Sequence, residues 1–130
     1  MKSSFTVRYH HDNVDRSVKI NIIVKQNNNV LYEKVQDLRC YASPLDINFE
    51  FETLTPIQLE FATNDVSMDL NPLYIDRIQL DQYADIPFFA HSGMFVKDNV
   101  QHSNGNCLYS NGSLIYTFDL PFCRNYNVVI

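Results

Sequence analysis

Four histidines and two pairs of aspartates are the residues of this chain that could bind a metal ion. They are His10, His11, His91 and His102, and the pairs Asp12 with Asp15 and Asp65 with Asp69. The histidines have no cysteine or carboxylate at the short paired spacing typical of zinc sites. The aspartate pairs lack the glycine-containing loop and final glutamate of a dedicated calcium motif. We therefore expect solvated loop histidines and turn-forming aspartates, with no metal and no cofactor.

Nucleophilic catalysis is not indicated by any local motif. A serine, cysteine or carboxylate nucleophile needs a base beside it in space, and motifs that announce such an arrangement, such as Gly-x-Ser-x-Gly, do not occur. We therefore predict no catalytic residues and a chain that is not an enzyme.

Tyrosines set among amides are the residues that could bind a sugar. An aromatic ring packs against the apolar face of a pyranose, while nearby amides bond its hydroxyl groups. Most of the eight tyrosines and nine phenylalanines must belong to the core, because the hydrophobic alternation of the chain places them inside. The candidates for ligand contact lie in the more polar segments of the chain, of which 64–71 and 91–106 are the longest predicted loops. These candidates are Tyr41, Asn64, Asp65, Tyr83, His91, Asn104 and Tyr109.

Arg8, Asp76 and Arg77 are charges within β-rich, apolar runs, the first in 5–9 and the others in 73–80. Their apolar neighbours predict burial on at least one face of each strand. Alternation puts Asp76 and Arg77 on opposite faces of one strand, so Arg8 on a neighbouring strand is the natural partner of Asp76. We interpret these three residues as a structural ion-pair cluster and not as a catalytic site.

A hydrophobic period of two runs through most of the chain and positions these residues. The triplet Asn27-Asn28-Asn29 predicts a turn, because asparagine tolerates left-handed backbone. In the strand predicted for 73–80, the apolar residues change from one face to the other between Ile75 and Ile78. This change indicates either a bulge or a centre buried on both faces. The strands predicted in this part of the chain cover 5–9, 18–24, 30–38, 47–51, 57–61 and 73–80.

The C-terminal segment 84–130 carries one further strong signal. Its run 107–116 around Asn111-Gly112 predicts a hairpin, because Asn-Gly fits a type I′ turn. Leu114, Tyr116 and Phe118 supply the inward face of the second strand.

The number and spacing of these short strands predict the architecture. We expect an all-β fold, an antiparallel β-sandwich of the jelly-roll or carbohydrate-binding-module type. A chain of 130 residues can bury enough surface for one domain, so we expect a single domain over 1–130 in which 84–130 completes the sandwich.

Two strand motifs are specific enough to indicate a family. The early strand contains Val7 and Arg8, and the later one reads Tyr74-Ile75-Asp76-Arg77-Ile78. Over residues 5–83 the chain thus resembles the third, lectin-like domain of the three-domain insecticidal crystal toxins (delta-endotoxins) of Bacillus. In that family the two motif strands lie in the middle of the sandwich, so the resemblance implies that the pair between Arg8 and Asp76 is buried. It also implies binding to a glycan or glycoprotein on a target cell.

Charge and cysteine content exclude several classes. A net charge of −5 argues against a nucleic-acid partner, since phosphate binding depends on clustered Lys and Arg. No window approaches the roughly 18 apolar residues that span a bilayer, and the first residues lack the apolar core of a signal peptide. Three cysteines, Cys40, Cys107 and Cys123, leave at least one thiol unpaired, and a bond between the last two stays open.

Two functions of different classes fit these observations. The first is a non-catalytic recognition module that binds a glycan or glycoprotein on target cells, either held in an intracellular crystal inclusion or released as a toxin component. The alternative is a small structural protein, an accessory crystal component or a virion protein, that self-associates through edge strands and an amide-rich surface. Membrane insertion by this chain alone is not expected, because no segment has the length or 3.6-residue period of a pore-forming helix.

Overall fold

The computed structural model describes most of the chain and shows only strands and turns in it. The described residues are 2–11, 17–39, 44–51, 53, 55–63, 72–80, 84–85, 93–105, 107–108 and 112–118. They contain the strands β1 (Lys2–His10), β2 (Val18–Gln26), β3 (Asn29–Leu38), β4 (Leu45–Glu50), β5 (Ile57–Thr63), β6 (Leu73–Leu80), β7 (Ala84–Asp85), β8 (Gly93–Lys97), β9 (Val100–Gly105), β10 (Cys107–Leu108) and β11 (Gly112–Phe118). Nothing in this part of the chain is a helix long and apolar enough to cross a membrane.

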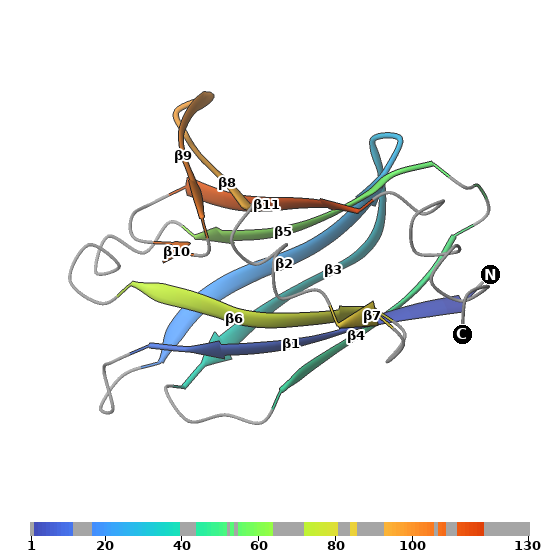
Figure 1. Cartoon of the computed structure of the whole chain (residues 1–130), viewed down its shortest axis with the longest axis horizontal. Helices are drawn as coiled ribbons and strands as arrows, with labels where there is room; N and C mark the ends of the chain where they lie inside the picture. The colour runs from blue at the N-terminus through green and yellow to red at the C-terminus, as the bar shows by residue number, and fades with distance from the viewer. Residues whose placement is uncertain are drawn as a thin grey trace.

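The strands form two antiparallel sheets packed face to face (Figure 1). The five-stranded sheet has the order β10-β6-β1-β4, with β7 also paired to β6. The six-stranded sheet has the order β3-β2-β5-β11-β8-β9, and the β8–β9 hairpin extends away from the first residues of β11 (Figure 1). The predicted antiparallel β-sandwich is confirmed.

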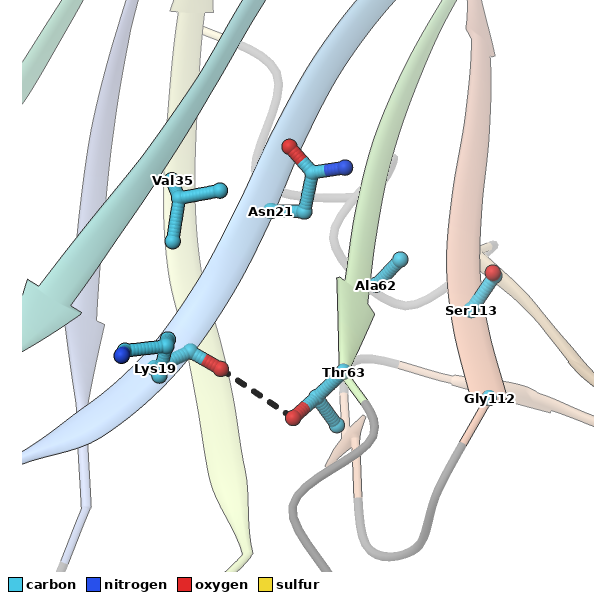
Figure 2. Close-up of a pocket in the computed structure, with 7 residues that line it drawn as sticks. All are labelled: Lys19, Asn21, Val35, Ala62, Thr63, Gly112 and Ser113. Carbon is cyan, nitrogen blue, oxygen red and sulfur yellow. Dashed lines mark hydrogen bonds between the residues drawn. The ribbon is translucent and has the colours of Figure 1, made fainter.

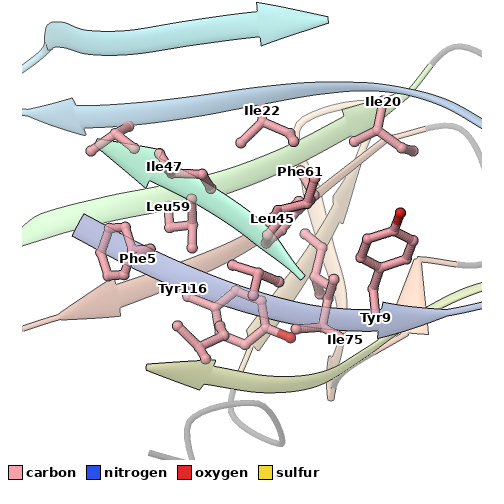
Figure 3. Packing of buried hydrophobic residues seen from close by; sticks show 14 of the residues in the cluster. Phe5, Tyr9, Ile20, Ile22, Leu45, Ile47, Leu59, Phe61, Ile75 and Tyr116 are labelled. Carbon is pink, nitrogen blue, oxygen red and sulfur yellow. The ribbon is translucent and has the colours of Figure 1, made fainter. Parts of the chain in front are cut away.

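The core lies between the two sheets and follows the alternation of the sequence. In β1 the side chains of Phe5, Val7 and Tyr9 are buried while the residues between them are less so. Phe5 stacks on Phe49 of β4 with ring centroids 5.1 Å apart, and it meets Phe118 of β11 at 4.9 Å. Figure 3 shows side chains of both sheets meeting in this layer. Burial of the inward face of most long strands holds the sandwich together, whereas in the outer strand β3 only Leu38 is buried.

A β-bulge interrupts the pairing of β1 with β6. Arg8 is opposite Arg77, but the next residue, Tyr9, is opposite Ile75, so Asp76 is an extra residue in β6. After the extra residue, the side chains of β6 point to the opposite faces from those that regular alternation would give. Ile75 and Ile78 can therefore both be fully buried. Of the two alternatives that the sequence left open, a bulge or a centre buried on both faces, the structure shows the bulge.

The buried ion pair expected between Arg8 and Asp76 is not formed. Arg8, Asp76 and Arg77 are all exposed, and Nδ1 of His10 lies 2.8 and 2.7 Å from the two carboxylate oxygens of Asp76. The bulge is the physical reason, because it moves Asp76 out of the position opposite Arg8 and lets two successive residues face solvent. The two motif strands are nevertheless neighbours in the middle of their sheet.

The C-terminal part of the chain contributes to both sheets. Strand β11 lies between β5 and β8, with Leu114, Tyr116 and Phe118 buried. Strand β10 pairs with β6 in the other sheet, so the hairpin predicted for 107–116 is wrong. The local turn signal said nothing about which partners the two flanking strands would find.

The actual hairpin in this region joins β8 to β9. Asp98 and Asn99 adopt left-handed backbone, with φ of 54° and 61°, as a type I′ turn requires. The long polar loop predicted for 91–106 is therefore wrong over 93–105, which is a hairpin. Gly93 and Phe95 are buried, while Met94 and Val96 are half-buried. Burial along β8 thus alternates with the period of two that is typical of a strand.

Deleting Asp76 should leave the fold intact. The deletion removes the extra residue of the bulge, so that Ile75, Arg77 and Ile78 would alternate regularly against β1 in the register they already have. We expect the free energy of unfolding to change by less than about 1 kcal/mol, near the range of ordinary surface changes. Chemical denaturation followed by circular dichroism measures this.

Deletion of Asn48 is the matched control, because it removes an exposed residue from the regular strand β4. A one-residue slip there turns either Ile47 or Phe49 toward solvent, so a loss of about 3 kcal/mol or more is expected. Equal losses for the two deletions would contradict the assignment of Asp76 as a removable insertion.

Candidate functional site

The predicted loop site falls outside the residues that the structure describes. This applies to Tyr41, Asn64, Asp65, Tyr83, His91 and Tyr109. Only the backbone of Asn104 is described, where it lies in β9 opposite Met94. The sugar site at these residues therefore stays a prediction.

A groove lies on the outward face of the six-stranded sheet. It has a volume of about 660 Å³ and is open to solvent. Figure 2 looks onto it and shows side chains from β3, β2, β5 and β11 side by side. Its lining residues are Lys19, Asn21, Val35, Ala62, Thr63, Gly112 and Ser113.

Strand pairing forms the groove by placing small outward side chains in one row. Asn21 is opposite Val35 on one side and Ala62 on the other, and Ala62 is opposite Ser113. The row crosses four adjacent strands, about 14 Å at the usual strand spacing. Because Ala62 and Ser113 are short and Gly112 has no side chain, the surface is lower along this row.

The polar groups of the groove are only partly satisfied by the protein. Asn21 Nδ2 donates to Glu33 Oε2 at 3.1 Å, and the Thr63 hydroxyl donates to the Lys19 carbonyl at 3.1 Å (Figure 2). Among the described residues, the Oδ1 of Asn21 is buried and finds no donor. A buried acceptor without a donor is costly, so this amide is not explained by stability.

A second depression, of about 480 Å³, lies at the β2–β3 turn and is less suited to a ligand. Its most buried amide, Gln26, already donates from Nε2 to the carbonyls of Thr53 and Thr55 at 2.8 and 3.1 Å. The Asn27 amide donates to the Thr55 hydroxyl at 3.0 Å. These amides hold the segment after β4 against the turn.

Of the four histidines, the structure describes the side chains of His10 and His11, and each contacts another residue of the chain. His10 binds Asp76, and His11 is buried, contrary to the expected solvated histidine, because its Nε2 donates to the Leu38 carbonyl at 2.8 Å. Within the described part of the chain, no three histidine, cysteine or acidic side chains gather as a metal site would require. The aspartate pairs considered from the sequence lie outside that part.

Cys107 is a free thiol in the structure, half-buried at the edge of the five-stranded sheet. Burial raises the pKa of this thiol, and a hydrogen bond with the Tyr74 side chain partly opposes that rise. The thiol therefore stays protonated, and poorly nucleophilic, at neutral pH.

Comparisons with known proteins show the fold. Two solved structures are similar. One is the selenomethionine form of vCBM60, whose description reports circular permutation as an evolutionary link between two families of calcium-dependent carbohydrate-binding modules. It has a TM-score of 0.52 and 18% identity, over 88% of this chain and 89% of that one. The complex of vCBM60 with galactobiose has a TM-score of 0.52 and 15% identity over 88% of this chain and 99% of that one.

The fold is that of a carbohydrate-binding module. At these identities the likeness to carbohydrate-binding modules concerns architecture. No family model matches the chain, and no match was found among curated proteins.

Replacing Asn21 by valine should stabilise the protein. The change removes a buried acceptor that has no donor among the described residues and places a β-branched side chain in a strand. We expect the free energy of unfolding to rise by about 1 kcal/mol, measured by urea denaturation. Asn48→Val in β4, where the asparagine is exposed, reports the gain from strand propensity alone. An equal gain at both positions would show that the Asn21 acceptor carries no penalty.

Proposed function

We propose that this chain is a non-catalytic glycan-binding module and that the groove on the six-stranded sheet holds a short, uncharged oligosaccharide. The observation that carries the proposal is the cross-strand row of small and polar residues on the open face of a carbohydrate-binding-module sandwich. A row that crosses four strands gives an extended, shallow surface, which suits a chain of sugar rings better than a compact ligand.

The groove offers both kinds of contact that a sugar needs. The Lys19 ammonium and the Ser113 hydroxyl can bond sugar hydroxyl groups. After rotation of the Asn21 amide, a sugar hydroxyl can also donate to its Oδ1, which finds no donor among the described residues. Val35, which is 57% exposed, and Ala62 offer an apolar surface to the C–H face of a ring. With few contacts per ring, the affinity of such a surface is low, about millimolar.

Calcium has no part in this proposal. The similar structures are of calcium-dependent modules, but the described residues bring no set of three acidic or histidine ligands together. We therefore expect binding at the groove to be unchanged by EDTA.

The setting in which the module acts is proposed from the sequence resemblance. Strands β1 and β6 carry the motifs similar to the third domain of the crystal toxins, and they pair with each other in the middle of their sheet. These motifs support recognition of a glycan or glycoprotein on a target cell by a toxin component. The alternative, a structural protein acting by self-association, requires ordered assembly that depends on protein concentration and no glycan binding.

Ala62→Phe should weaken glycan binding at the groove, because the aromatic ring would fill the middle of the row. Titrations followed by backbone amide NMR shifts, starting with galactobiose and a panel of uncharged oligosaccharides, measure the affinity. We expect at least about a tenfold loss, or 1.4 kcal/mol of binding free energy.

Gln58→Phe is the matched control, since it adds the same ring to the same face of β5, one row beyond Glu60 and outside the groove. Its affinity should stay within about twofold of the parent chain. Shifts confined to the five-stranded sheet, or a panel without any binder, would contradict the groove as the glycan site.

A further inference from the structure

Two arginines face each other on the outward surface of the five-stranded sheet. Arg8 in β1 is directly opposite Arg77 in β6, and both residues are exposed. Opposite positions in an antiparallel pair bring side chains close together, and like charges placed there repel. Such a pair gains stability when an anion lies between the two guanidinium groups.

The bulge creates this pair of like charges. If the register between Tyr9 and Ile75 continued without interruption, Asp76 would lie opposite Arg8 and would neutralise it. The extra residue replaces that carboxylate with a second guanidinium. Bulges are frequent next to functional sites, where they redirect side chains.

The arginine pair lies between two other pairs on the same face. On one side Thr6 is opposite Gln79, and on the other His10 is opposite Tyr74. The rings of His10 and Tyr74 are stacked, with centroids 4.9 Å apart and an angle of 13° between their planes. Hydroxyl and amide groups, two guanidinium groups and a pair of rings thus follow one another along two strands. We call these six residues the arginine strip.

Acidic side chains flank the strip but are engaged by neighbours. Asp76 pairs with His10 at 2.7 Å, and Asp46 accepts a hydrogen bond from the Thr6 hydroxyl at 3.2 Å. Two cations bordered by carboxylates suit a single anionic group on a polar ligand. A continuous polyanion such as a nucleic acid would meet repulsion along the strip.

We propose that the arginine strip binds an acidic saccharide. The guanidinium groups of Arg8 and Arg77 hold its uronate carboxylate or sulfate ester, because guanidinium forms paired hydrogen bonds with such planar or tetrahedral anions. The neighbouring sugar rings lie over His10 and Tyr74 on one side and bond Thr6 and Gln79 on the other. The strip is on the sheet opposite the groove, so its binding and that of the groove are separate properties.

Trigalacturonate, with galactotriose as the uncharged analogue of the same length, tests the proposal on the full chain. Backbone amide NMR shifts should appear in β1 and β6 with trigalacturonate and not with galactotriose. A sulfated galactan oligosaccharide distinguishes ester from carboxylate: stronger binding of either one identifies the preferred group. Inorganic sulfate binding as tightly as the saccharides would overturn the proposal of a saccharide ligand, and so would an acidic peptide that binds as tightly at the strip.

Arg8→Gln and Arg77→Gln should each weaken trigalacturonate binding about tenfold. Lys34→Gln, which removes one exposed cation from β3 of the other sheet, should change it by less than about twofold. The thermal midpoint of the Arg8→Gln variant should stay level or rise, because like-charge repulsion is relieved. Unchanged affinity in both variants, or a lower midpoint with unchanged affinity, would overturn the site, whatever the groove binds.

Discussion

Ile75 and Ile78 both have to reach the core, and a regular strand cannot bring them there. The two residues are separated by three positions, and a period of two would point them to opposite faces. One extra residue solves the conflict, and the consequences extend across the sheet. Asp76 turns outward to His10, Arg77 takes the place opposite Arg8, and the apolar pattern on both sides of the bulge continues into the core.

The same requirement of shared burial links distant parts of the chain. Strand β11 joins β5, which carries buried Leu59 and Phe61, to β8, which carries Phe95. Its own Phe118 contacts Phe5 at the start of the chain. The core therefore depends largely on non-local contacts, and folding has to close long loops before these contacts form.

Sequence reasoning predicted the local properties of the strands better than their partners. Alternation identified the inward faces of β1, β2, β4 and β5, and three asparagines marked a turn where Asn27 and Asn28 are left-handed. It did not show that β10 and β11 belong to different sheets, because a turn signal does not specify pairing. The groove was missed for a related reason: Asn21, Ala62 and Ser113 each look like ordinary outward residues until register aligns them.

Strand β3 is an outer edge of the six-stranded sheet, and its charges affect how copies of the chain can meet. A second copy could extend the sheet by pairing its own β3 antiparallel to this one. If the outward faces of both sheets are aligned, one residue of β3 then lies opposite the same residue of the other copy. If the two copies pair with Glu33 opposite Glu33, or with Lys34 opposite Lys34, identical charges face each other. If they pair with Val35 opposite Val35, Glu33 of each copy faces Asp37 of the other. Like-charge repulsion thus disfavours these three registers and narrows the ways in which a second copy can extend this edge, although the backbone of β3 is open on one side.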